Sequence, residues 1–202
     1  MRYFNTTFIN QTVNNPTNSY NLEDKIMSIE TITNAQLSPY ERIGGAPTIR
    51  ALVNRFYDLM DLEPKYLELR EAHGSTLEEA GNRLYMFLSG WLGGPDLYTE
   101  QHGHPRLRSR HFPFKIGTLE RDQWVACFTQ SMVELNIEHD IQKELLIQIY
   151  SLAEWMRNQP DKTEGNPIPP IYAQQSRDQV INKIISVAHR YTVPCVFSSE
   201  QY

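Results

Sequence analysis

Three histidines, three arginines and a lysine gather in one polar stretch in the middle of the chain, residues 93–117. Arg108 and Arg110 come just before His111, and the apolar run Phe112–Phe114 follows it at once. Imidazole is a common metal ligand, aromatic rings pack against flat apolar surfaces, and guanidinium groups pair with carboxylates. This order of residues therefore favours a flat, mostly apolar ligand that carries acidic groups along one edge.

Haem meets that description: an imidazole would bind its iron, phenylalanine rings would lie against the porphyrin, and arginine or tyrosine would meet the propionates. A histidine beside aromatic residues is nevertheless more often structural than a metal ligand. On residue types alone, both interpretations of His111 stay open.

Amphipathic helices must position this stretch, because apolar residues recur at helical spacing on both sides of it. Each predicted helix has a start signal: Pro47, a Ser-Thr-Leu-Glu capping box at Ser75, Thr118 and Asp140. We find no alternation of apolar and polar residues long enough to build a sheet. The sequence therefore predicts an all-α domain.

Three regions follow from composition. Residues 1–36, rich in Asn and Thr, predict a flexible N-terminal extension; residues 37–158 predict the helical domain; residues 159–202 predict a Pro-rich linker and a C-terminal helical extension. Within the last region, apolar residues at helical spacing predict one helix over residues 178–190. It would pack either on the domain or on a partner.

Charge and composition exclude several classes of function. The formal net charge is −5 and the pI is about 5.7, so no basic footprint for nucleic acid is present. No apolar run is long enough to span a bilayer, so we expect no membrane association. With only two cysteines, Cys127 and Cys195, a disulfide framework is not expected, and we predict a cytoplasmic protein.

Several ordered segments resemble the group II truncated haemoglobins. They are Gly44-Gly45, Phe56-Tyr57, FLSGWLGGPDLYTEQHGHPRLRSRHFPFKIG over residues 87–117, and ERDQWVACF over residues 120–128. The resemblance covers about residues 38–158. It implies a globin-like two-over-two helical sandwich with N- and C-terminal extensions, and haem b as the iron cofactor. The glycine pairs would supply positive φ angles and close approach of the backbone.

The resemblance also implies roles for single residues. His111 takes the proximal, iron-binding position. Tyr57 and Trp124 take distal positions, and Ala80, which cannot donate a hydrogen bond, leaves polar stabilisation to them and to one loop residue, for which we favour His73. The remaining cofactor-binding candidates are Leu84 on the distal face, Tyr98, Arg108 and Arg110 at the haem edge, and Phe87, Phe114 and Ile116 on the haem faces.

By this resemblance, the chain binds O₂ and other diatomic ligands such as CO and NO, either to hold or transport O₂ or to sense it. Hydroxyl and indole N–H donors would make O₂ binding tight and slow. The alternative is a redox enzyme, an NO dioxygenase or a peroxidase, that draws electrons from a separate reductase, since no Gly-x-Gly-x-x-Gly motif is present. A third interpretation is a partner-docking module that uses the helix around residues 180–188. A monomer and a homodimer both remain open.

Overall fold

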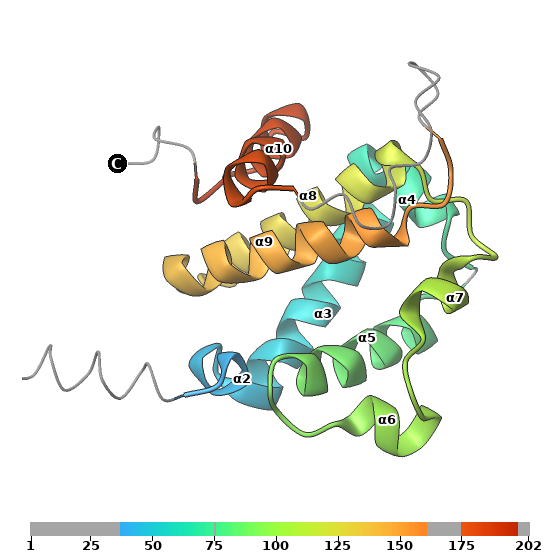
Figure 1. Ribbon diagram of the computed structural model, residues 1–202, viewed down its shortest axis with the longest axis vertical. Coiled ribbons are helices and arrows are strands. Elements are labelled where there is room, and N and C mark those ends of the chain that lie inside the picture. Colours follow the sequence, from blue (N-terminus) through green and yellow to red (C-terminus); the bar gives the residue numbers. More distant parts are fainter. Residues whose placement is uncertain (1–36, 75, 161–174, 198–202) are drawn as a thin grey trace, which may run out of the picture. The chain divides into compact units, whose positions relative to one another are not determined.

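The computed structural model describes residues 37–74, 76–160 and 175–197. Every regular element in these ranges is a helix (Figure 1). In chain order they are α2 (Pro39–Arg42), α3 (Gly45–Leu62), η1 (Pro64–Tyr66), α4 (Leu67–Glu71), α5 (Glu78–Trp91), α6 (Leu97–His102), α7 (Leu107–His111), α8 (Thr118–Glu134), α9 (His139–Met156) and α10 (Arg177–Arg190). The predicted extension over residues 1–36 and most of the predicted linker lie outside the described residues.

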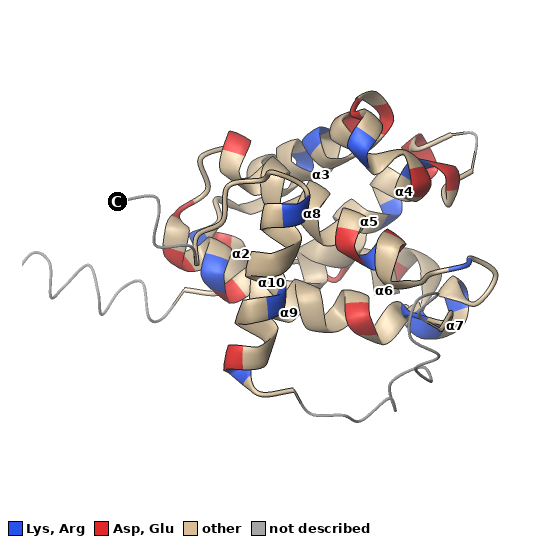
Figure 2. Cartoon of the chain, turned by 90° about the horizontal axis from the view of Figure 1, so that it is seen from above, with Lys and Arg blue, Asp and Glu red and all other residues tan. Residues whose placement is uncertain are grey.

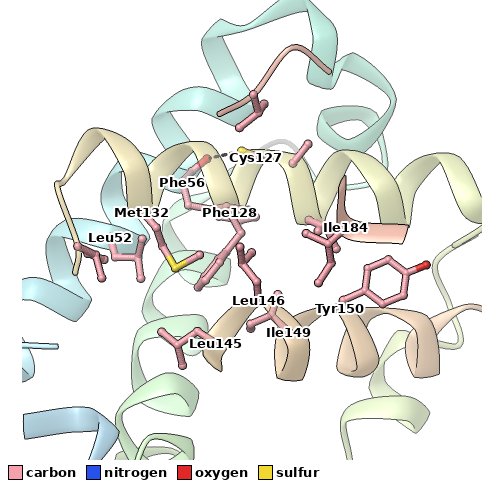
Figure 3. Packing of buried hydrophobic residues seen from close by; sticks show 14 of the residues in the cluster. Leu52, Phe56, Cys127, Phe128, Met132, Leu145, Leu146, Ile149, Tyr150 and Ile184 are labelled. Carbon is pink, nitrogen blue, oxygen red and sulfur yellow. Dashed lines mark hydrogen bonds between the residues drawn. The ribbon is translucent and has the colours of Figure 1, made fainter. Parts of the chain in front are cut away.

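Two helix pairs form the body of this unit: α3 packs against α5, α8 packs against α9, and α3 crosses α8 (Figure 1). Side chains from both pairs meet in one core, in which Phe56 of α3, Phe128 and Met132 of α8, and Leu146 of α9 are almost fully buried (Figure 3). The sequence predicts these helices because their apolar residues follow helical spacing. The two-over-two, all-α architecture expected from the resemblance is confirmed.

The helix starts differ in detail from the prediction. Thr118 and Asp140 lie inside α8 and α9, whose N-cap residues are Gly117 and Glu138. At α8 the side chain of Glu120 reaches back and accepts the backbone N–H of Gly117 at 2.7 Å, which satisfies a free N–H without a capping hydroxyl. Helix α5 begins at Glu78 after Leu77, and the predicted cap residue Ser75 lies outside the described residues.

The glycine pairs meet the backbone requirements expected of them. Gly44 has φ +100° at the N-cap of α3, and Gly93 has φ +89° after α5, where residues with a Cβ are strained. At Gly94 the reason is steric and not conformational, because a Cβ there would lie 2.3 Å from Cδ2 of Tyr40. Gly44 thus shapes the start of α3, and Gly93 and Gly94 shape the turn between α5 and α6.

Helix α10 covers α8 and α9 on the side away from α3 (Figure 1). Its apolar residues Val180, Ile184, Val187 and Ala188 are buried there, and Figure 3 shows Ile184 pointing toward these helices. The face that a docking module would have offered to a partner is thus covered within the chain. This also explains why α8 is buried on nearly all sides, a pattern that a one-sided helix prediction does not anticipate.

Charged residues are buried beneath α10. The carboxylate of Asp122, 1% exposed, accepts from Nε of Arg121 at 2.6 Å and from Nη1 of Arg190 at 2.5 Å. Arg121 also donates to the hydroxyl of Tyr150 at 2.7 Å and to the carboxylate of Glu154. Burial opposes the charge of Arg121, but Asp122, Tyr150 and Glu154 outweigh it and raise its pKa.

Within the described part of the chain, we find no helix with the length and apolar character required to cross a membrane.

Candidate functional site

A cavity of about 310 Å³ opens between the helix pairs, within the range typical of cofactor and ligand sites. Its walls come from α3, α4, α5, α8 and α9 together with the segment that contains α6 and α7. Apolar side chains make up most of the lining, and the polar groups are few. All the predicted cofactor-binding residues except Arg108 line it.

His111 is the last residue of α7 and faces this cavity. Its Nδ1 lies 2.7 Å from the carbonyl oxygen of Leu107, one turn earlier in the same short helix. A carbonyl only accepts, so Nδ1 carries the proton and Nε2 keeps its lone pair. Nε2 has no hydrogen-bond partner among the described residues. An oriented imidazole with a free Nε2 is the form in which histidine binds a metal.

Asn158 fixes the segment that follows His111. Its Nδ2 donates to the carbonyl oxygens of His111 at 3.1 Å and Phe114 at 2.7 Å, and its Oδ1 accepts the N–H of Ile116 at 3.0 Å. Local sequence does not reveal this role, because Asn158 lies 47 residues along the chain from His111. The loop after His111 is therefore held in place by the end of α9.

Arg108 faces away from the cavity. Its Nη1 donates to the carbonyl oxygens of Trp155 and, at 3.4 Å, Arg157, both at the end of α9. The guanidinium also lies near the rings of Phe112 and Trp155. Arg108 thus joins α7 to α9, and the structure does not bring it together with the other predicted site residues.

Tyr57 and Trp124 face the cavity from α3 and α8. The indole of Trp124 stacks on Phe128 at 5.2 Å and 9°, and the ring of Tyr57 meets Phe56 edge-on at 5.0 Å. Neither the Tyr57 hydroxyl nor the Trp124 N–H bonds to any described residue. Burial raises the pKa of Tyr57, so its hydroxyl stays protonated and able to donate.

His73 follows α4 and lies beside Tyr57, with 6.0 Å between the ring centroids. Its Nδ1 is 2.8 Å from the carbonyl oxygen of Leu69, so Nδ1 carries the proton here as well. Burial lowers the pKa of His73, which favours the neutral ring. In this form Nε2 accepts hydrogen bonds or binds a metal, but it does not donate.

Cationic side chains border the cavity on the side of α5 and α7. Arg110 of α7 lies over the ring of Tyr98, 5.8 Å from its centroid, and both line the cavity. Figure 2 shows basic residues on α7, and residues 101–117 contain no Asp or Glu. Arg83 of α5 also lines the cavity and was missed in the sequence analysis, although its place one turn after Ala80 and Glu79 on the predicted face of α5 could have revealed it.

Apolar residues supply the remaining walls. Ala80, Leu84 and Phe87 come from α5, and Phe114 and Ile116 come from the loop held by Asn158. Helix α9 contributes four residues that sequence reasoning did not include in the site: Ile149, Leu152, Ala153 and Met156. Their spacing marked them only as core residues, since helical periodicity does not distinguish a side chain that faces a ligand from one that faces another side chain.

The residues present fit a haem better than a bare metal ion. Among residues 37–74, 76–160 and 175–197 no three His, Cys, Asp or Glu side chains cluster to hold a metal, so an iron at His111 would need its other ligands from a macrocycle. The apolar walls suit a porphyrin, Arg83 and Arg110 suit its propionates, and the hydroxyl of Tyr57 bonds to none of the described residues.

Comparisons with known proteins agree with this geometry. The family described as bacterial-like globin matches residues 38–158. A group 2 truncated haemoglobin from Bacillus subtilis is 37% identical over 124 residues, which cover 61% of this chain and 91% of that protein. Among solved structures, the group II 2-on-2 haemoglobin of Agrobacterium tumefaciens has 43% identity and a TM-score of 0.60, over 62% of this chain and 97% of that one. A cold-adapted truncated haemoglobin from Pseudoalteromonas haloplanktis has 39% identity and a TM-score of 0.60, over 61% of this chain and 100% of that one.

Proposed function

We propose, from the premise that this chain belongs to the bacterial-like globin family as a group II truncated haemoglobin, that it binds haem b through His111 and holds O₂ tightly in the cavity. The observation that supports this proposal is the ring of His111: its Nδ1 bonds to the carbonyl oxygen of Leu107, and its Nε2, at the wall of a largely apolar cavity, bonds to none of the described residues. Haem held by His111 would supply an iron that binds a diatomic ligand.

Tyr57 and Trp124 would stabilise that ligand. O–H and N–H donors favour a ligand that gains negative charge on binding over one that stays nearly neutral, so these two donors would favour O₂ over CO. His73 plays a different part in this proposal, since its Nε2 does not donate while the ring is neutral. Its ring packs edge-on against Tyr57 and would help to orient the ring that carries that donor.

The propionates would meet Arg83, Arg110 and Tyr98. Arg83 pairs with Glu79 and Arg110 donates through Nε to the carbonyl oxygen of Pro105, so both guanidinium groups are partly oriented and keep further N–H donors. Arg108 keeps its predicted role at the haem edge only if it releases the carbonyl groups of α9.

Titration of the purified full chain with haemin tests the proposal. We expect saturation at one haem per chain, and a ferrous-CO spectrum typical of histidine ligation. A matched titration of Phe112→Ala, an exposed residue next to His111 that does not line the cavity, should give the same result. Failure of the wild type to take up haem stoichiometrically would reject the proposed function.

Removal of the distal donors should speed the loss of O₂. Tyr57→Phe and Trp124→Phe each delete one donor, worth about 1.5–3 kcal/mol to a charged acceptor, so we expect the O₂ dissociation rate to rise roughly 10- to 150-fold in each variant. Stopped-flow displacement of O₂ measures this rate. CO dissociation should change much less, because CO offers the donors little charge.

His73→Phe is the matched control for this series. Because Nδ1 of His73 is bonded to Leu69 and Nε2 does not donate, we expect a smaller rise in O₂ dissociation than in either donor variant. If His73→Phe releases O₂ faster than Tyr57→Phe, His73 is the principal donor and our assignment of the distal pair is wrong.

A further inference from the structure

We propose that the C-terminal segment of the chain positions the distal wall of the cavity, through Tyr191 and Gln123 acting on α4. Both would be positioning residues: neither lines the cavity, but each holds the backbone that carries Leu69 and His73. Tyr191 directly follows α10 and lies beyond residues 38–158, the part of the chain that matches the globin family. The path runs from α10 through η1 and α4 to the cavity.

Helix α4 is a part of the cavity wall that depends on support from other elements. It has five residues, too few for a helix to be stable by itself, yet it and the two residues after it contribute Leu69, Ala72 and His73 to the cavity. Its backbone is held from outside, because the N–H of Leu69 donates to Oε1 of Gln123 at 2.7 Å. Nε2 of Gln123 donates to the carboxylate of Glu68 at 2.6 Å.

The same residue of α4 orients His73. While the N–H of Leu69 is bonded to Gln123, its carbonyl oxygen accepts from Nδ1 of His73 at 2.8 Å. Leu69 therefore connects a buried glutamine on α8 to an imidazole at the cavity. A shift of α4 away from Gln123 would move the His73 ring and its Nε2 with it.

Tyr191 supports α4 from its N-terminal side, through contacts with η1. Its ring stacks on Tyr66, with centroids 6.3 Å apart at 30°, and its carbonyl oxygen accepts from Nζ of Lys65 at 3.5 Å. Both partners lie in η1, immediately before α4. Burial raises the pKa of the Tyr191 hydroxyl, and the nearby Asp122 carboxylate raises it further, so the hydroxyl lies close to the neighbour of Gln123 on α8.

The packing of α10 against α8 and α9 fixes the position of Tyr191. Arg190 bonds to Asp122, the neighbour of Gln123 on α8, and Val187 and Ala188 are buried one turn earlier. After Tyr191 the chain stays anchored, since Val193, Cys195 and Val196 are buried as well. Buried residues thus hold the chain both before and after Tyr191. Helix η1 contacts Tyr191, and both η1 and α4 contact α8.

Hydrogen–deuterium exchange of the full chain tests this proposal without reference to ligand binding. In Tyr191→Ala, we expect peptides covering residues 66–74 to exchange on the order of tenfold faster than in the wild type, while peptides of α3 and α5 stay unchanged. Tyr191→Phe, which keeps the ring on Tyr66 and loses only the hydroxyl, should give an intermediate result.

Two controls separate positioning from general stability. Lys183→Ala changes an exposed residue of α10 and should have no effect. Ile184→Ala opens a cavity between α10 and the helices it packs on, α8 and α9, and should raise exchange across α8 to α10 rather than at residues 66–74. If Ile184→Ala opens residues 66–74 as much as Tyr191→Ala does, the C-terminal segment only stabilises the fold and the proposal is overturned.

A second readout concerns the ligand and rests on the proposed function. In the haem-loaded protein, the rate of CO association after flash photolysis should change about two- to thirtyfold in Tyr191→Ala, the range expected for residues that couple to a site without touching it. It should not change in Lys183→Ala. Equal rates in Tyr191→Ala and the wild type would overturn the link to the cavity. If the wild type takes up no haem, only the proposed function is rejected, because the exchange comparison does not depend on haem.

Discussion

His111→Gly should abolish coordination of the haem iron by the protein. The carbonyl oxygen of Leu107 orients the imidazole of His111, Asn158 holds the His111 backbone, and Nε2 has no partner among the described residues. We expect the variant to lose the ferrous-CO absorption spectrum of a histidine-ligated haem and to release haem to an acceptor protein far faster than the wild type. Absorption spectra of the ferric, ferrous and ferrous-CO forms measure the first effect.

Added imidazole provides the decisive control for this variant. Glycine leaves a space of the shape of the missing ring, so millimolar imidazole should restore the histidine-type spectrum in His111→Gly. His73→Gly supplies the matched comparison, because His73 also has Nδ1 bonded to a carbonyl and Nε2 free at the cavity. If His73→Gly loses the spectrum and His111→Gly keeps it, the proximal and distal sides are exchanged and our assignment fails.

Asp122→Asn should strongly destabilise the fold. The carboxylate is buried between Arg121 and Arg190, and removal of one partner from a buried ion pair leaves uncompensated charge at a cost of about 3–5 kcal/mol. Glu154 still pairs with Arg121, and the Arg190 side chain is 54% exposed, so we expect a loss near the lower end, about 3 kcal/mol. Urea denaturation at equal haem saturation measures the free energy of unfolding.

An exposed ion pair offers the control for this prediction. Glu144 pairs with Arg42 at 2.7 Å near the surface, where such pairs contribute about 0–1 kcal/mol. Glu144→Gln should therefore change the free energy of unfolding by less than 1 kcal/mol. Equal losses in Asp122→Asn and Glu144→Gln would mean that the charges beneath α10 contribute no more than surface charges do.

Two sets of contacts connect α10 with the cavity. Arg121 both holds Asp122 beneath α10 and lines the cavity, and the neighbouring Gln123 holds α4. Variants of Asp122 should therefore also disturb ligand kinetics. Tyr191→Ala should do so with a smaller loss of stability, because it removes no buried charge.

The sequence by itself predicted the parts of this protein that depend on local periodicity and on ordered motifs. The apolar spacing of residues 47–60 predicted α3, and the motif around His111 predicted a haem site of the group II truncated haemoglobin kind. The motif also brought Tyr57 and Trp124 into the prediction, although they are 67 residues apart. Neither residue stands out locally, because tyrosine and tryptophan on an apolar helix face usually belong to the core.

Only the tertiary structure decided the features that depend on which helix covers which face. Asn158 holds the loop after His111, Arg108 turns from the cavity to the end of α9, and Gln123 joins α4 to α8. The direction of a side chain among several helices is not encoded in local spacing. The burial of Asp122 and Arg121 is the clearest case: local sequence places charged residues on an exposed face, and the packing of α9 and α10 onto α8 removes them from water.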